Sequence, residues 1–365
     1  MANPIQVLND VRHLRARHGL PKTLFWAIIN HCNAVCLTCR FYLVPKTTWN
    51  YVHLEDARRA VDILYESDFR MTSITGGEPL MNPDVFDICD YLHKKNFMIT
   101  YMPTNGTLVT KRVAGRLKDA DVKLVGVSID MDDGNGMGLT RKIPHLRETV
   151  IRARECLEGE GLKTYAGILL TKKTADVGRV LDLVKDLGFD KVVFSYPQLV
   201  QSSSYMASRE SEDLMLDVDE LERVVKAIRS AKRNGDGISI HNPSRSLDEF
   251  AKHYEGRPRT YKCYGGSKLF YLDWNLDLYR CFTLPTRYGN LLELGKVDIE
   301  EDPCDLCTQQ AFRDHDPFYY LGETLIESKN LLAGGHVVSA VRKLATPETR
   351  AAYHALYELM TGGFA

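Results

Sequence analysis

The feature that most constrains the fold of this 365-residue chain is an alternation of short apolar segments with amphipathic ones. In 54–64, for example, apolar residues recur at helical spacing. Such alternation predicts right-handed crossovers and a parallel sheet. The expected strands are 23–30, 70–75, 97–102, 123–130, 163–170, 190–196 and 237–240, and the expected helices are 54–64, 83–95, 110–119, 145–160, 175–187 and 217–234.

These units predict an α/β fold, a partial (β/α)6 TIM-like barrel over 23–240. No GxGxxG motif follows the first strand, so nothing supports a dinucleotide-binding domain. Beyond the barrel, linkers are expected at 242–244 and 256–259, and an exposed insertion at 201–217. The remaining expected parts are an N-terminal helix over 1–22, a small β-hairpin domain over 258–312 and C-terminal helices over 313–365, with breaks at Gly334–Gly335 and Pro347.

The charge balance excludes some classes of partner. Lys and Arg number 47 and Asp and Glu 48, which leaves a formal charge of -1 and no footprint for nucleic acid or an anionic membrane. No apolar stretch approaches the ~20 residues of a membrane span. The N-terminus lacks the apolar core of a signal peptide. We therefore expect a cytoplasmic protein with no nucleic-acid partner and no transmembrane segment.

Three cysteines follow the first expected strand at the spacing C-x3-C-x2-C: Cys32, Cys36 and Cys39. Cysteine thiolates are the usual ligands of iron–sulfur clusters, and a cubane cluster has four irons. Three ligands leave one iron open, where chemistry can take place. A zinc site instead wants four ligands, usually as two close pairs. Cys89 and Cys156 stand singly in helical patterns, so we interpret them as small hydrophobes.

Three more polar or glycine-rich clusters follow the next three expected strands, at 75–79, 103–106 and 128–130. In (β/α) barrels the chemistry gathers at the carboxyl ends of the strands. Four such clusters at four successive strand ends therefore indicate a single site.

The cysteine triplet, followed by Gly76-Gly77-Glu78-Pro79 after the second strand, resembles the radical S-adenosylmethionine (SAM) superfamily over roughly 20–240. The resemblance implies that the amine and carboxylate of SAM chelate the open iron. It also implies reductive cleavage of SAM to a 5′-deoxyadenosyl radical, with an electron donor such as flavodoxin or ferredoxin. The cofactor-binding residues that it implies are Gly76, Gly77, Glu78, Pro79, Asn105, Ser128, Asp130 and Arg141.

The residue types suit these implied roles. Glycines at 76 and 77 allow the backbone to approach the methionine amino group closely, and Glu78 adds an acceptor. The resemblance places Ser128 and Asp130 near the methionine end and the ribose. The planar guanidinium of Arg141 suits the cofactor's carboxylate.

Four later cysteines lie around a predicted hairpin with strands at 268–273 and 278–281. They are Cys263, Cys281, Cys304 and Cys307, in the order single, single, pair. Four cysteines saturate a cluster. Their order resembles the Twitch domain, the shortened form of the SPASM extension, which implies an auxiliary [4Fe–4S] cluster for electron transfer. A structural zinc site of four cysteines also leaves no coordination position free, and it remains an alternative.

The sequence thus predicts a radical SAM enzyme that attacks an unactivated carbon of a small molecule, with the net reaction undecided. Only 31 residues precede Cys32, too few for the N-terminal peptide-binding domain of many peptide-modifying members. Peptide or lipid modification stays an alternative, as does an iron–sulfur sensor or scaffold without turnover.

Two residues at later strand ends, Tyr196 and His241, are candidate catalytic residues. A structural role is the alternative for the histidine. The apolar residues at 331–333 and 337–338 suggest a lipid site, but core packing is the simpler explanation.

Overall fold

The computed structural model describes residues 16, 19–132, 134–196, 202–206, 214–235, 237–307 and 309–361. The N-terminal helix expected over 1–22 lies almost entirely outside these residues.

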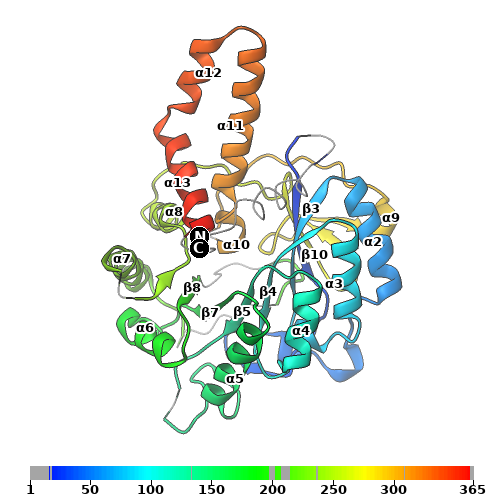
Figure 1. Cartoon of the computed structure of the whole chain (residues 1–365), viewed down its shortest axis with the longest axis vertical. Coiled ribbons are helices and arrows are strands. Elements are labelled where there is room, and N and C mark those ends of the chain that lie inside the picture. Colours follow the sequence, from blue (N-terminus) through cyan, green and yellow to red (C-terminus); the bar gives the residue numbers. More distant parts are fainter. Residues whose placement is uncertain are drawn as a thin grey trace.

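A 10-stranded sheet organises the molecule, in the order β12-β11-β10-β1-β3-β4-β5-β7-β8-β9 (Figure 1). From β1 to β9 the neighbours are parallel and follow the order of the chain, so every crossover moves in the same direction. The predicted partial barrel is confirmed. Its strands are β1 (Lys22–Ala27), β3 (Phe69–Thr75), β4 (Met98–Thr104), β5 (Val125–Ser128), β7 (Thr164–Leu169), β8 (Lys191–Ser195) and β9 (Ser239–Ile240).

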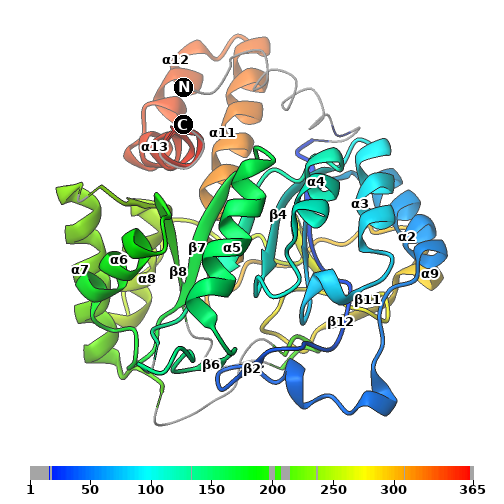
Figure 2. The ribbon, with the colours of Figure 1, turned by 60° about the horizontal axis from the view of Figure 1, so that its bottom comes forward.

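The helices of the barrel lie along the outer side of the sheet (Figure 2). Each begins and ends close to its predicted bounds, because local signals mark the ends. Asp217, for example, forms a capping box with Glu220 at the start of α7. The helices are α2 (Leu54–Glu66), α3 (Val85–Lys94), α4 (Lys111–Asp119), α5 (Leu146–Gly159), α6 (Val177–Asp186) and α7 (Val218–Asn234).

The second cysteine segment extends the barrel sheet. Strand β10 (Leu269–Leu272) pairs in parallel with β1, and β11 (Asp277–Tyr279) and β12 (Arg287–Asn290) follow it antiparallel. The predicted hairpin is therefore present, and it continues the sheet at the β1 edge. A short helix, α9 (Leu291–Leu294), follows β12.

Two expectations for the connections are wrong. Where a linker was expected to begin, α8 (Ser244–Tyr254) forms, because Leu247 and Phe250 are buried in the core and Pro243 suits a helix start. Within the expected exposed insertion, Tyr205 contacts the core: its ring centroid lies 4.1 Å from that of Phe282.

The C-terminal helices form as predicted, with breaks at the glycine pair and at Pro347. They are α10 (Gln310–Arg313), α11 (Asp316–Ala333), α12 (Val337–Leu344) and α13 (Pro347–Thr361). Helices α11 and α12 project from the barrel (Figure 1). The expectation that their apolar residues pack in the core is wrong, since Leu332 is 49% exposed and Val338 is 72% exposed. None of the described helices is long and apolar enough to cross a membrane.

Candidate active site

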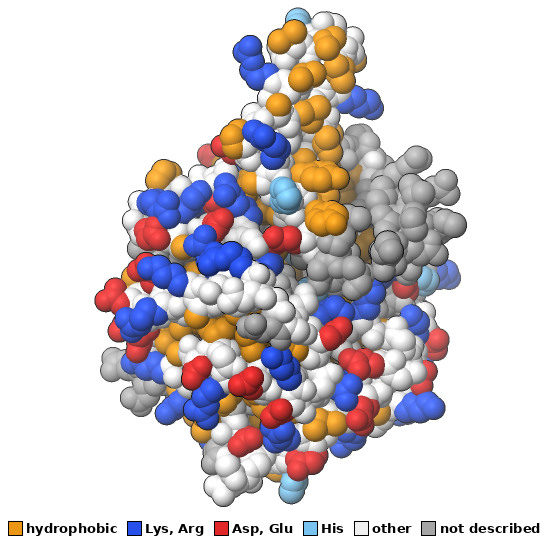
Figure 3. Space-filling view, turned by 60° about the vertical axis from the view of Figure 1, so that its left-hand side comes forward, with side chains coloured by type: hydrophobic (Ala, Val, Ile, Leu, Met, Phe, Trp, Pro, Cys, Tyr) orange, Lys and Arg blue, Asp and Glu red, His pale blue; other side chains and the backbone are white. Residues whose placement is uncertain are grey.

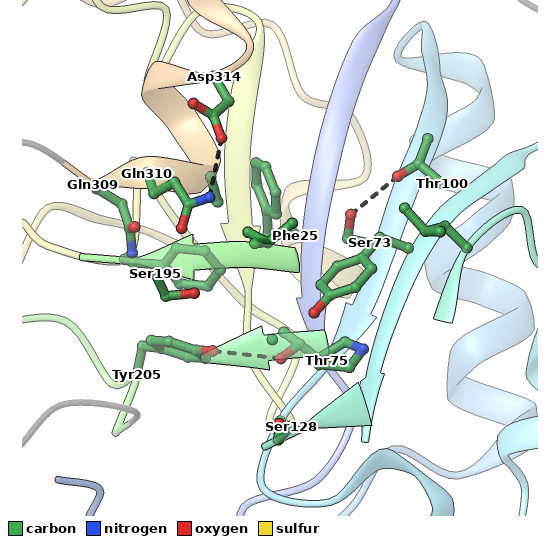
Figure 4. Close-up of a pocket in the computed structure, with 18 of the residues that line it drawn as sticks. Phe25, Ser73, Thr75, Thr100, Ser128, Ser195, Tyr205, Gln309, Gln310 and Asp314 are labelled. Carbon is green, nitrogen blue, oxygen red and sulfur yellow. Dashed lines mark hydrogen bonds between the residues drawn. The ribbon is translucent and has the colours of Figure 1, made fainter. Parts of the chain in front are cut away.

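A cavity of about 1030 Å³ opens where the strands of the barrel end. Figure 4 shows Thr75, Ser128 and Tyr205 toward one end and Gln310 and Asp314 toward the other. The cavity wall gathers most of the residues predicted from the sequence, from segments far apart in the chain: Cys32, Cys36, Cys39, Gly76, Gly77, Glu78, Asn105, Ser128, Arg141, Tyr196 and His241.

The cysteine loop is held by a two-stranded sheet of its own. Strand β2 (Val35–Cys36) pairs antiparallel with β6 (Arg141–Lys142), which places Cys36 opposite Arg141. The backbone N–H of Cys39 donates to the carbonyl of Cys36 at 3.0 Å and closes the turn between them. The local pairing thus directs the triplet at one end of the cavity.

Hydrogen-bond donors surround the three sulfurs. The N–H of Ala34 lies 3.4 Å from Cys32 Sγ, and Arg141 Nη1 lies 3.5 Å from Cys36 Sγ. Burial raises the pKa of Cys32 to about 12 and that of Cys39 to about 11, so a metal must displace their protons to bind. Three cysteines on one loop, with donors to sulfur, supply the ligands that a [4Fe–4S] cluster with one open iron takes, although their side chains, like those of the other described residues, are not arranged around a metal ion.

The two glycines bring the end of β3 against the cysteine loop. Gly77 N–H donates to the Ile29 carbonyl, and Glu78 N–H to the His31 carbonyl, both at 3.1 Å. A Cβ on Gly77 would lie 1.9 Å from His31 O, and Gly76 has φ of +143°. The structure therefore requires glycine here for a contact within the protein, a reason that the sequence did not show.

Glu78 is a cross-link between two loops. Its side chain is buried, and its carboxylate accepts hydrogen bonds from Thr104 Oγ1 at 2.9 Å and from Asn105 N–H at 2.7 Å. Burial raises the pKa of Glu78 to about 7, against the effect of these bonds. Pro79 starts the 3-10 helix η3 (Pro79–Met81) and is not among the residues of the cavity wall.

Asn105 joins the loop after β4 to the cysteine loop. Its Nδ2 donates to Asn33 Oδ1 at 2.8 Å and lies 3.6 Å from Cys32 Sγ. Its Oδ1 accepts from the N–H of Thr107 at 3.0 Å. The amide thus positions the first cysteine.

Asp130 lies behind the wall. Its carboxylate is buried and accepts hydrogen bonds from the N–H groups of Thr140 and Arg141, the latter at 2.7 Å. Asp130 is not among the residues of the cavity wall, and the contact to SAM that the resemblance implied for it stays a prediction. Strand β5 ends at Ser128, so the alternation of side chains that would put Asp130 beside Ser128 no longer holds.

Aromatic rings and a carboxyl group form another part of the wall. Tyr101 and Tyr165 stack at 5.4 Å, and His241 lies 5.9 Å from the Tyr165 ring. Burial raises the pKa of Asp314 to about 6 and that of Tyr196 well above its usual value. Within the described residues, Asp314 Oδ1 has no hydrogen-bond partner.

Sequence reasoning missed several residues of the wall. Tyr101 and Tyr165 lie on predicted strands, where an inward-facing parity was a usable signal. Tyr205 and Asp314 lie outside the alternating pattern, and only the tertiary structure brings them to the cavity.

The four late cysteines also come together. Contact between the thiols of Cys263 and Cys304 lowers the pKa of Cys304 and raises that of Cys263. Burial raises the pKa of Cys281 to about 11, and the neighbouring Cys307 contributes in the same direction. Backbone N–H groups donate to these sulfurs, as from Gly265 to Cys263 at 3.4 Å.

These contacts show proximity and not a formed coordination sphere. Among the described residues, no group of three or more His, Cys, Asp or Glu side chains is arranged to hold a metal ion. Arg313 is buried nearby and pairs with the buried Asp316 at 2.8 Å, and Asp316, followed by the thiols of Cys263 and Cys307, acts to raise its pKa against the effect of its burial. A buried cation suits the net negative charge of a cluster held by four thiolates.

Phenylalanines lie between the cavity and the late cysteines. The ring centroids of Phe25 and Phe312 are 4.8 Å apart, and those of Phe282 and Phe312 are 5.5 Å apart. Phe25 and Phe282 line the cavity, while Phe312 and Cys263 both lie near Gly265.

Comparisons with known proteins agree with this geometry. A model of the radical SAM superfamily matches residues 26–184, which include the triplet, the glycine motif and Arg141. Residues 26–184 of this chain are therefore a radical SAM domain. Members of this superfamily are enzymes that bind SAM and [4Fe–4S] clusters.

Similar proteins differ in what they make. The AdoMet-dependent heme synthase of Methanosarcina barkeri (strain Fusaro / DSM 804) is 25% identical over 174 residues, 47% of this chain and 50% of the relative. The subtilosin biosynthesis protein AlbA of Bacillus subtilis (strain 168) is 31% identical over 112 residues, 30% of this chain and 25% of the relative.

A solved structure of native anSMEcpe with bound AdoMet has the same fold, with a TM-score of 0.59 at 20% identity over 75% of this chain and 79% of that one. The match to this chain spans half or less of the length of each of the two curated relatives, so they do not establish its reaction.

Proposed function

We propose that this protein is a radical SAM enzyme acting on an unactivated carbon of a small molecule held in the cavity. The observation that carries the proposal is that the cysteine triplet and Arg141 share one wall with a large space beyond them. When bound, the cluster and SAM supply reductive carbon–sulfur cleavage to a 5′-deoxyadenosyl radical.

The residues of the chain would hold and orient these groups. Cys32, Cys36 and Cys39 ligate the cluster. Arg141, beside Cys36, supplies a fixed positive charge for the carboxylate of SAM. Ser128 supplies a hydroxyl in the same wall, and Asn105 contacts the first cysteine. Glu78 and Asp130 act as positioning residues, because their carboxylates hold the loops that carry the others.

The substrate would lie between this site and the residues around Asp314. Tyr196 and His241 line the cavity and are the proposed catalytic contacts. The wall there is largely aromatic, with Tyr101 and Tyr165 stacked, which favours a small molecule with an apolar body. The similarity to a heme synthase is compatible with such a compound. Peptide modification is the second candidate, because of the similarity to AlbA.

The late cysteines would hold an auxiliary [4Fe–4S] cluster. Their proximity, the N–H donors to their sulfurs and the buried Arg313 support this assignment. With four cysteine ligands, such a cluster has no open iron and is suited to electron transfer. The rings of Phe25, Phe282 and Phe312, which contact one another, would lie between it and the cavity. A flavodoxin or ferredoxin in the cytoplasm would supply electrons.

Anaerobic reconstitution, with iron, sulfide and zinc counting, tests both assignments. We expect about eight irons per chain, and 5′-deoxyadenosine formation with dithionite and SAM. The variant Cys32→Ala/Cys36→Ala/Cys39→Ala should keep about four irons and form no deoxyadenosine. In the matched variant Cys263→Ala/Cys281→Ala, about four irons should remain in the SAM-binding cluster.

The outcomes separate the alternatives. About four irons plus one zinc in the unmodified chain would exclude the auxiliary cluster. A full iron content without deoxyadenosine would favour a sensor or scaffold.

A further inference from the structure

The hairpin of α11 and α12 carries an exposed apolar surface that the fold does not cover with any described residue. We call it the apolar tip. Its members lie in the second half of α11 and along α12, on the projecting part of the molecule (Figure 3). It consists of Leu332 (49% exposed), Val337 (55%), Val338 (72%), Val341 (58%) and Leu344 (37%).

The apolar tip forms a stripe along α12. Positions 337, 338, 341 and 344 share one side of a helix, since 3.6 residues make a turn. Ala340 borders this stripe and is fully buried, so one edge of the stripe packs against the protein. The larger apolar side chains beside it nevertheless stay exposed, and a contiguous exposed apolar patch of this kind is unusual on a soluble domain.

Most of the charges around the apolar tip are positive, although Glu327 and Glu348 flank it. The segment 328–346 contains Lys329, Arg342 and Lys343 and neither Asp nor Glu, although the whole chain has a formal charge of -1. Lys343 pairs with Glu327. Lys329 and Arg342 are exposed. Figure 3 shows basic side chains beside the apolar ones on the hairpin.

An exposed apolar stripe with the exposed cations Lys329 and Arg342 beside it matches one occupant best, a bilayer that contains anionic lipid. In a symmetric contact between two copies of the chain, the exposed cations of one copy would lie near those of the other, and like charges repel.

The hairpin is also continuous with the cavity. Phe318 and Tyr319 from α11 and Leu356 from α13 line the cavity, and the apolar tip lies at the other end of α11. A membrane that binds the apolar tip would therefore lie on the side of the molecule where α11 and α13 line the cavity.

We propose that the apolar tip docks this protein onto the surface of an anionic lipid bilayer. Val337, Val338 and Val341 enter the boundary between headgroups and acyl chains, and Lys329 and Arg342 lie among the lipid phosphates. The docking is peripheral and reversible. It does not depend on the proposed reaction, because none of these residues lines the cavity.

Vesicle cosedimentation of the reconstituted 365-residue chain tests the proposal. We expect binding to vesicles of phosphatidylcholine with phosphatidylglycerol, and at least about tenfold weaker binding to phosphatidylcholine alone. The variant Val338→Asp/Val341→Asp should weaken binding to the anionic vesicles at least about tenfold. Lys329→Glu/Arg342→Glu should weaken it similarly and reduce its dependence on salt.

Val218→Asp is the matched control, because Val218 is 52% exposed at the start of α7, away from the hairpin. It should bind vesicles as the unmodified chain does. All variants should keep their melting temperature and deoxyadenosine formation. No binding to anionic vesicles, or equal binding by Val338→Asp/Val341→Asp, would overturn the proposal. So would a dimer in sedimentation that the same double variant dissociates.

Discussion

At the scale of single residues, the site depends on close packing between loops as much as on the groups that face the cavity. Gly77 makes this plain, since any side chain there overlaps the carbonyl of His31. The sequence motif singled out this position as cofactor-binding, which stays a prediction. The structure adds a packing reason for glycine, which depends on where the cysteine loop lies.

Replacing Gly77 with Ala should therefore lower the free energy of unfolding by about 3 kcal/mol or more. The same change at Gly115, in the middle of α4 with nothing within 4 Å of an added Cβ, should raise it by about 0.5–1 kcal/mol. Urea unfolding of both variants measures the contrast. Equal effects at the two positions would contradict the packing argument.

Asp314 should make stability depend on pH in the direction opposite to most carboxylates. Burial raises its pKa from the usual value of 3.8 to about 6, so the folded state holds the proton more tightly than the unfolded state. Stability is then lost as pH rises between these two values, by at most about 3 kcal/mol.

Asp314→Asn removes this loss. Its gain in stability over the unmodified chain should be small near pH 4 and grow to a plateau above about pH 7. Urea unfolding across this range measures it. A gain that stays constant with pH would show that the carboxyl does not titrate as its burial requires.

At the scale of elements, the sequence predicted the helices and strands correctly wherever the hydrophobic periodicity and the signals at the ends of the element agree. Each predicted strand from β1 to β9 and each barrel helix is present, since these patterns reflect which side of each element is buried. Helix α8 was missed because its Asn-Pro-Ser start resembles a turn and only Leu247 and Phe250 mark its buried side. The exposed apolar residues of α12 were misassigned, since an apolar helical stripe ordinarily packs in a core.

The capping box of α7 offers a test at this scale. Asp217→Ala removes a side chain that accepts a hydrogen bond from Glu220 N–H at 2.7 Å, and should cost about 1 kcal/mol. Asp219→Ala is the control, because it removes an acid from the same first turn without touching the cap. Chemical unfolding should show a clearly smaller loss for the control, and deoxyadenosine formation should be unchanged in both.

At the scale of the whole molecule, the two cysteine sets lie in segments connected to one continuous sheet. Strand β10 pairs with β1, so the segment with the late cysteines extends the edge that leads into the triplet. The proposed clusters would therefore tie residues 32–39 and 263–307 into the folded state, which the unfolded chain cannot reproduce.

We expect the reconstituted protein to melt well above the cluster-free chain, because ligands that bind only the folded state stabilise it. Cys263→Ala/Cys281→Ala should lose part of this increase and the triplet variant another part. Anaerobic scanning calorimetry measures the melting temperatures. The same melting temperature with and without iron would show that the clusters do not link these segments.

The sequence by itself determined the barrel, the site at its strand ends and the cysteines that point to iron–sulfur chemistry. Periodicity and spacing are local, and parallel strands bring their carboxyl ends to one edge without further information. Only the tertiary structure decided that β10 joins β1, that Asp314 and Tyr205 reach the cavity, and that Asp130 lies behind Arg141. It also decided that the apolar tip stays exposed. These features depend on which surfaces meet between segments far apart in the chain, and no local pattern records that.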